Sequence, residues 1–307
     1  MPPPGVLAIV NPVAARGAAL STWRQVETPL TQLFPGLAIR TTQARGDAER
    51  WAGEWARAHP DGTVVAVGGD GTMHEVVNGL LGAAATTSIG MIPAGTGNDF
   101  ARNTGVPTAA HAALERLGRN IPVSVDAGRI RFETATGIPG LRWFVNSASL
   151  GVSARANRIA GRIRRLVPGR ICYPISGVLG LIGERAGQYT IRSSDRTTFS
   201  GRALNVTLAN GASFGGGMRI SPASSTSDGI LDQVVIGDIG RIPALLALTR
   251  LYAGTHVRMR GISVAPVSTE VEITRADGPM LVEADGEDFE TAGPVFIEPV
   301  RGAIRLL

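Results

Sequence analysis

The chain has 307 residues, of which 44% are apolar and 18% charged, and its formal net charge is +5. This balance excludes a disordered or fibrous protein, and the length favours two domains that share a cleft. The longest apolar runs fall short of the ~18 residues that a membrane-spanning helix needs. The start, Met1-Pro2-Pro3-Pro4, lacks the basic region of a secretion signal, so we expect a water-soluble, cytoplasmic protein.

Every one of the 30 basic residues is an arginine, because the sequence contains no lysine. P-loop NTPases and protein kinases need a lysine on the phosphates, so neither mechanism is expected in its usual form. The positive charge tolerates an anionic partner, either nucleic acid or an anionic bilayer. Nucleic acid is the poorer candidate, since aromatic residues make up only 5% of the chain. The single cysteine, Cys172, is expected to be buried and not to form a metal cluster.

The first part of the chain alternates short β-branched runs with helical patterns, which predicts an α/β domain with an open, mostly parallel sheet flanked by helices. We assign it residues 1–122, with residues 298–307 returning to it. The second expected helix carries Trp51 and Trp55 on one face, which we interpret as a core-facing stripe. The expected strands are Val6–Val10, Leu37–Thr42, Thr63–Val67 and Ser88–Ile92, and the expected helices are Ala18–Leu33, Asp47–His59 and Thr72–Leu81.

Residues 123–297 show many short strands separated by Gly, Ser, Asp and Pro, which predicts an antiparallel β-sandwich or barrel. Two helical insertions interrupt it, at Arg155–Gly183 and Ile242–Tyr252. The first contains five arginines among apolar residues, namely Arg158, Arg162, Arg164, Arg165 and Arg170. The expected strands are Arg142–Ser149, Ala203–Ala209, Ile230–Ile236, Glu270–Thr274 and Met280–Ala284.

Two glycine-rich strand-to-helix junctions carry the chemistry of the first domain. Backbone amides can approach phosphate oxygens there, and a helix N-terminus favours negative charge. Asp70 would act through magnesium or water, or accept a proton. Asn98 alone is better explained as a helix cap. The first junction is Gly68, Gly69, Asp70, Gly71 and Thr72, and the second is Gly95, Thr96, Gly97, Asn98 and Asp99.

Two further turns complete the candidate site. Asn11 closes the first strand, and the turn after it contains Arg16, which suits the edge of a triphosphate. Asp285-Gly286-Glu287 follows a strand and places two carboxylates on a tight turn. An attacking alcohol must lose its proton, so a positioned carboxylate is needed, although the spacing alone also fits a solvated acidic turn.

These residues, taken together, resemble the soluble diacylglycerol kinase family, which includes bacterial lipid kinases and sphingosine and ceramide kinases. The ordered motifs span residues 11 to 287, and their combination is far more specific than the Gly-Gly-Asp-Gly turn that NAD kinases and phosphofructokinases share. The resemblance rests on Asn11-Pro12, Gly68–Thr72 with His74–Gly79, Gly95–Ala101, and Asp285–Glu287. This chain departs from the family in having arginines where lysines are common.

The resemblance implies an ATP- and magnesium-dependent lipid kinase whose active site lies in the interdomain cleft. The resemblance also implies that Asp285 acts as the general base, supported by Glu287. It further implies a magnesium site formed by Asp228, Ser225 and Ile230. The ATP site it implies consists of Asn11, Thr42, the residues from Gly68 through Met73 to His74, and Thr96.

Two other functions remain open at this stage. An NAD-kinase-like phosphotransferase would share the Gly-Gly-Asp-Gly-Thr turn, and a non-catalytic nucleotide or lipid sensor would share the scaffold. The expected partner is a lipid acceptor at an anionic membrane surface, reached by peripheral attachment through the arginine-rich insertion. A homodimer is also open.

Overall fold

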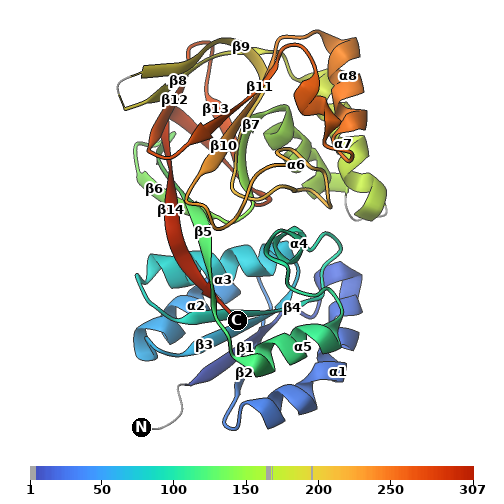
Figure 1. Ribbon diagram of the computed structural model, residues 1–307, viewed down its shortest axis with the longest axis vertical. Helices are drawn as coiled ribbons and strands as arrows, with labels where there is room; N and C mark the ends of the chain where they lie inside the picture. Colours follow the sequence, from blue (N-terminus) through green and yellow to red (C-terminus); the bar gives the residue numbers. More distant parts are fainter. Residues whose placement is uncertain (1–4, 164–166, 168, 195) are drawn as a thin grey trace. The chain divides into compact units, whose positions relative to one another are not determined.

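The computed structural model describes residues 5–163, 167, 169–194 and 196–307. It divides the chain into two compact units, Met1–Asp126 with Gly302–Leu307, and Ala127–Arg301. The sequence predicts that the chain crosses from the first domain to the second at residue 122 and returns near residue 298. Both crossings in the structure lie inside long strands, β5 (Val123–Thr134) and β14 (Glu287–Leu306) (Figure 1).

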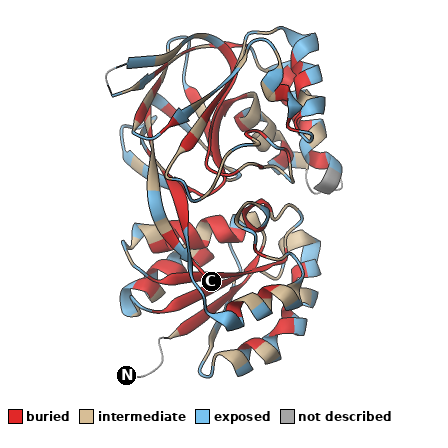
Figure 2. Cartoon of the chain, in the orientation of Figure 1, coloured by how far each residue is buried: buried red, intermediate tan, exposed pale blue. Residues whose placement is uncertain are grey.

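The first unit contains a parallel sheet in the order β14-β4-β3-β1-β2. Its strands are β1 (Val6–Val10), β2 (Ala38–Thr41), β3 (Thr63–Gly68), β4 (Ser88–Pro93) and the last residues of β14. Strands β1, β3 and β4 are buried along their whole length (Figure 2), which is typical of a parallel sheet covered on both faces. The open, parallel α/β architecture expected from the sequence is confirmed.

The helices of this unit pack in pairs on the sheet (Figure 1). Helix α2 lies against α3, and α1 lies against α5. A side chain at Gly79 of α3 would collide with the carbonyl oxygen of Glu49 in α2, so the close approach of these two helices requires glycine. The helices are α1 (Ala18–Leu33), α2 (Asp47–Ala58), α3 (Asp70–Gly82), α4 (Asp99–Thr104) and α5 (Ala110–Arg119).

Helix α2 buries its small residues and not its two tryptophans. Its buried residues are Ala48, Ala52, Gly53 and Ala56, because the close contact with α3 leaves no room for larger side chains. Trp51 and Trp55 are half-buried, so the predicted core-facing stripe is only partly confirmed. The indole N–H of Trp55 is buried and its ring stacks on His59, whereas Trp51 lies near the guanidinium groups of Arg40 and Arg50.

The second unit is an antiparallel β structure in which the pairings β9-β8-β12-β14-β13-β7-β9 form a closed circuit. Its core is apolar and includes Phe144, Leu150, Val206, Val282 and Ile297. The expected sandwich or barrel is therefore confirmed. The strands, besides β5 and β14, are β6 (Pro139–Phe144), β7 (Ser147–Gly151), β8 (Gly187–Ser193), β9 (Arg196–Ala209), β10 (Leu231–Gly237), β11 (Ile262–Val267), β12 (Val271–Arg275) and β13 (Met280–Ala284).

One strand of this unit differs from the sequence prediction. The run Arg142–Ser149 is not one strand but the end of β6 and the start of β7, separated at Val145 and Asn146. The expected helical insertion at Arg155–Gly183 is confirmed and contains the helices α6 (Val152–Ile163) and α7 (Gly169–Gly183). The other helical segments are α8 (Arg241–Arg250) and a short 3-10 helix at Thr255–Arg258.

Candidate functional site

The loops that leave the parallel sheet of the first unit are tied to one another. Because β1 to β4 run in the same direction, the residues that follow them lie at one edge of the sheet. The backbone N–H of Asn11 donates to Val67 O (2.9 Å), and that of Ala94 donates to Gly68 O (2.7 Å). At the other side, Thr42 N–H donates to Val10 O at 2.9 Å. The candidate nucleotide-binding residues of the first unit are therefore brought together.

The two glycine-rich junctions touch backbone to backbone. A Cβ atom on Gly69 would lie 2.9 Å from the Cα of Gly95, closer than real Cβ atoms come to other atoms. Gly68 has no room for a side chain either, since the hydroxyl of Thr72 fills that position. The side-chain Nδ2 of Asn11 donates to the Thr72 hydroxyl at 3.0 Å, which joins the loop after β1 to the first turn of α3. These contacts leave the start of α3 with its backbone amides beside side-chain-free residues, an arrangement suited to phosphate.

Asp70 joins the first junction to the second. One of its carboxylate oxygens accepts the N–H of Phe100 at 3.0 Å, in the first turn of α4. The buried Asp99 accepts a hydrogen bond from the guanidinium of Arg102 at 2.7 Å. Both carboxylates thus fix the start of α4, and a carboxylate at that end of a helix is favoured by the helix dipole.

The side chain of Asn98 does not cap α4, contrary to the sequence prediction. Asn98 adopts a left-handed conformation with φ +52°. Its side chain turns back onto its own loop, accepting from Gly95 N–H (3.0 Å) and donating to Gly95 O (3.1 Å). The loop from Gly95 to Asn98 is therefore closed by Asn98, while Thr96 at its tip is exposed.

Two of the expected ATP-site residues point their side chains into the protein. Met73 is fully buried and His74 almost so, and both lie among other buried residues of α3. Asn78 donates to the carbonyl of His74 at 3.0 Å one turn later. The structure thus gives the Met73 and His74 side chains a packing role in α3.

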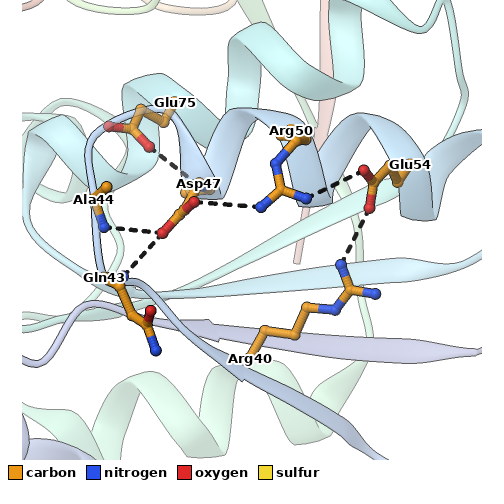
Figure 3. Close-up of polar contacts among 8 residues, drawn as sticks. Arg40, Gln43, Ala44, Asp47, Arg50, Glu54 and Glu75 are labelled. Atoms are coloured by element: carbon orange, nitrogen blue, oxygen red, sulfur yellow. Dashed lines mark hydrogen bonds and ion pairs between the residues drawn. The ribbon is translucent and has the colours of Figure 1, made fainter.

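A polar network orients the loop that carries Thr42 (Figure 3). Asp47 accepts the N–H groups of Gln43 and Ala44, both at 2.9 Å, and these bonds lower the pKa of its carboxyl. Glu75 of α3 accepts the N–H of Ala48 at 3.1 Å, which ties α3 to the start of α2. Sequence reasoning assigned Glu75 no such role, because a contact 27 residues away leaves no local pattern.

Arg16 lies on a short irregular segment after β1. Ala15 and Arg16 both have positive φ values, +48° and +60°, which are costly for residues with a side chain. The side chain of Arg16 is exposed. This loop lies at the same edge of the sheet as the two glycine-rich junctions. Backbone strain of this kind is often found at binding sites.

In the second unit, the acidic turn is a two-residue β-hairpin between β13 and β14. Asp285 and Gly286 both have positive φ values, +47° and +91°, and Ala284 pairs with Glu287 across the turn. Consecutive positive φ values are those of a type I′ turn, for which Asp-Gly is a preferred sequence. The turn geometry thus follows directly from the local sequence.

The Asp285 carboxylate is held by three consecutive backbone amides. One oxygen accepts Val145 N–H at 2.6 Å, and the other accepts Asn146 and Ser147 N–H at 2.9 and 3.1 Å. These are charge-assisted bonds, and they explain why the backbone between β6 and β7 leaves the sheet there. The carboxylate is therefore fixed in position, as a group that acts on a substrate in one geometry must be.

Glu283 lies beneath the acidic turn and was not singled out in the sequence. It is only 5% exposed, and one of its oxygens accepts Gly286 N–H at 2.5 Å. Burial raises the pKa of its carboxyl to about 8, against the opposing effect of that hydrogen bond. Asn157 of α6 donates to Gly286 O at 2.9 Å, so the turn is held from both sides.

The loop expected to bind magnesium precedes β10. Asp228 is exposed, and one of its oxygens accepts Ile230 N–H at 3.0 Å. The hydroxyls of Ser225 and Ser227 lie 3.3 Å apart in the same loop. Among the described residues, no group of three or more His, Cys, Asp or Glu side chains could hold a metal. One carboxylate with nearby hydroxyl and carbonyl oxygens is the donor type that a hydrated Mg²⁺ accepts.

Comparison with known proteins matches both halves of the chain to family models. Residues 5–130 match the diacylglycerol kinase catalytic domain, and residues 146–307 match the YegS C-terminal NAD kinase beta sandwich-like domain. A catalytic kinase domain followed by this sandwich defines a lipid kinase of the diacylglycerol kinase class. The chain belongs to the YegS-like lipid kinase family, as its similarity to curated relatives also shows.

The relatives cover nearly the whole chain. A probable lipid kinase YegS-like from Xanthomonas euvesicatoria is 32% identical over 88% of this chain and 86% of its own length. The solved structure of a putative diacylglycerol kinase from Bacillus anthracis matches with a TM-score of 0.79 and 26% identity, covering 99% of this chain and 96% of that one. An NAD kinase from Archaeoglobus fulgidus, solved in complex with ATP, shares the fold at a TM-score of 0.54 and 14% identity, covering 98% of this chain and 92% of that one.

Proposed function

We propose that this lipid kinase transfers the γ-phosphoryl group of ATP, with Mg²⁺, to the hydroxyl of diacylglycerol or a related lipid. The observation that carries the proposal is the Asp285 carboxylate, fixed by three backbone amides on a hairpin turn in a chain of the lipid kinase family. A general base in a fixed position is what an alcohol acceptor requires.

The first unit would bind ATP at the edge of the parallel sheet where the loops that follow β1 to β4 lie. The backbone amides at the start of α3 and around Gly95 would contact phosphate oxygens, since both junctions lack side chains there. The exposed Arg16 would add a bidentate charge at the triphosphate, and Thr42 and Thr96 would offer hydroxyls. Gly68, Gly71, Gly97 and Asn11 shape this surface.

The second unit would supply the proton acceptor. Asp285 would take the proton of the lipid hydroxyl late in the attack on the γ-phosphorus, and Glu287, two residues later, would support it. The backbone amides of Val145 to Ser147 would keep the carboxylate oriented throughout the step. Glu283 and Asn157 would hold the turn in place through Gly286.

Two groups of oxygen atoms would be available to bind Mg²⁺. The loop with Ser225, Asp228 and Ile230 offers hard oxygen donors in the second unit, and Asp70 is the carboxylate within the phosphate-binding turn Gly68–Thr72. Mg²⁺, when bound, would neutralise charge that develops on the transferred phosphoryl group.

A screen of acceptors with labelled ATP and Mg²⁺ tests the function directly. Diacylglycerol, phosphatidylglycerol, a sphingoid base and NAD would each be offered under the same conditions. We expect label in one of the lipids and none in NAD. Turnover of NAD alone would replace the proposal with the NAD-kinase-like alternative, and absence of any transfer with tight ATP binding would favour a sensor.

A further inference from the structure

Helix α7 turns its large apolar side chains toward solvent. Ile171, Ile175, Leu179 and Ile182 recur at helical spacing and are 49%, 38%, 44% and 58% exposed. Among its described residues, the buried ones are Leu181 and four small residues, Cys172, Ser176, Gly177 and Gly180. A Cβ on Gly180 would lie 3.3 Å from the Cβ of Ala156 in α6. This distribution is the reverse of that in an ordinary surface helix, whose apolar stripe faces the core.

Helix α8 has the same inverted pattern beside it. Ile242 is 84% exposed and Leu245 and Leu246 are 45% exposed, while the buried residues of the helix are Ala244 and Ala247. The two helices pack together, since a Cβ on Gly177 of α7 would lie 3.0 Å from Leu248 of α8 (Figure 1). We call the outward side chains at positions 171, 175, 179, 182, 242, 245 and 246 the apolar face. Large apolar side chains exposed on two helices that pack together are typical of an interaction surface.

The charges at this face are positive. Neither α7 nor α8 contains an acidic residue, and the exposed Arg241 and Arg250 stand at the two ends of α8. Of the arginines expected in the first insertion, Arg158 is paired with Asp288 (2.8 Å) and Glu290 (2.7 Å), and Arg162 is exposed. Arg164 and Arg165 lie outside the described residues, and so does the side chain of Arg170.

We infer that the apolar face inserts into the surface of an anionic lipid bilayer, with Arg241 and Arg250 against the headgroups. This inference rests on the proposed function, whose acceptor resides in a bilayer. Exposed apolar side chains bordered by arginines fit the boundary between headgroups and acyl chains. A second copy of the chain fits less well, because a symmetric contact would bring the same positive ends together. Attachment through the arginine-rich insertion stays a prediction, to which this proposal adds apolar insertion through α7, which belongs to that insertion, and α8.

No helix in the described part of the chain is long and apolar enough to cross a bilayer. The face would therefore lie in the membrane surface, and its affinity would come mainly from buried apolar area. Raising the ionic strength would weaken the arginine contribution only, since salt screens charges and not apolar burial. Attachment that survives high salt distinguishes this inference from purely electrostatic binding.

Flotation with vesicles of phosphatidylcholine and phosphatidylglycerol, without ATP, tests the inference on the full chain. We expect Ile182→Asn and Ile242→Asn each to weaken binding about tenfold, at low and at high salt. Ile138→Asn is the matched control, because Ile138 is 62% exposed on a distant hairpin turn and should leave binding unchanged. Equal binding by all three variants and the parent, or binding abolished by salt alone, would overturn the inference.

Two further measurements separate this inference from its alternatives. Light scattering without vesicles should give the same mass for the parent and for Ile242→Asn; a parent dimer that this substitution splits would assign the face to a second copy. A short-chain diacylglycerol dispersed in detergent should be phosphorylated equally by the parent and Ile242→Asn. Vesicle binding that is intact in a chain transferring phosphate to no lipid would refute the proposed function and leave the membrane face standing.

Discussion

Replacing Glu283 by glutamine should stabilise the protein above about pH 5, and increasingly so up to about pH 8. The carboxyl is 5% exposed, and its second oxygen, Oε2, has no hydrogen-bond partner in the described part of the chain. Burial is the main cause of its raised pKa, and the negative charges of Asp285 and Asp288 add to it. Arg158 of α6 is paired with Asp288 at 2.8 Å, which places a positive charge beside that aspartate.

The sign and size of the effect follow from the two pKa values. The folded-state pKa of about 8 is above the ordinary value of 4.5. Stability is therefore fully present below pH 4.5 and is lost as pH rises toward 8, at about 1.4 kcal/mol per pH unit. The loss is on the order of 3 kcal/mol at pH 7 and reaches at most about 5 kcal/mol. Glutamine keeps the oxygen that accepts Gly286 N–H and does not titrate, so it avoids this loss.

Thermal unfolding at pH 4, 7 and 9 measures the difference. Each kcal/mol should move the midpoint by roughly 2 to 4 °C for a unit of this size. Glu133→Gln, on the exposed side of β5, is the control and should give a difference that does not change with pH. An advantage of Glu283→Gln that is the same at all three pH values would refute the assignment of a buried, protonated carboxyl.

Three further substitutions test particular contacts. Gly95→Ala should weaken ATP binding at least tenfold in calorimetry, because its Cβ would collide with the backbone of Gly69; Gly82→Ala, at the other end of α3, where a Cβ meets nothing within 4 Å, is its control. Glu75→Ala should cost about 1 kcal/mol of stability by removing the acceptor of Ala48 N–H, measured by urea unfolding. Arg158→Gln should lower stability by about 1 kcal/mol in low salt and less in high salt, since its ion pairs are partly exposed.

The first unit was predictable because its signals are local. Buried strands read as continuous apolar runs, and the glycines stand where the structure brings two backbones into contact. The acidic turn was predictable for the same reason, since Asp285-Gly286 is a preferred pair for its turn type. The Asp285 carboxylate accepts hydrogen bonds from the backbone amides of Val145 to Ser147, about 140 residues away in the sequence. A contact over that separation leaves no local sequence pattern.

Two features could not be predicted from the sequence, the burial of Glu283 in β13 and the outward apolar side chains of α7. Both depend on which helix covers which face of a neighbouring element. In β13 the alternation puts Glu283 on the face opposite Val282 and Ala284, where a solvated glutamate would be expected. Helix α6 covers that face and buries it. The outward apolar residues of α7 were equally hidden, because helical spacing shows a stripe but not the direction it faces.

The central claim is that Asp285 acts as the base in phosphoryl transfer, and the variant Asp285→Asn tests it most directly. Transfer to the best lipid acceptor and the ATP dissociation constant should be measured together, with Asp277→Asn, on another turn of the second unit, as control. We expect Asp285→Asn to lose at least a thousandfold in transfer with an ATP dissociation constant close to that of the control. Its thermal midpoint should fall, because the asparagine Nδ2 cannot accept a backbone N–H as the carboxylate oxygen does. Transfer at the parent rate by Asp285→Asn would contradict the mechanism.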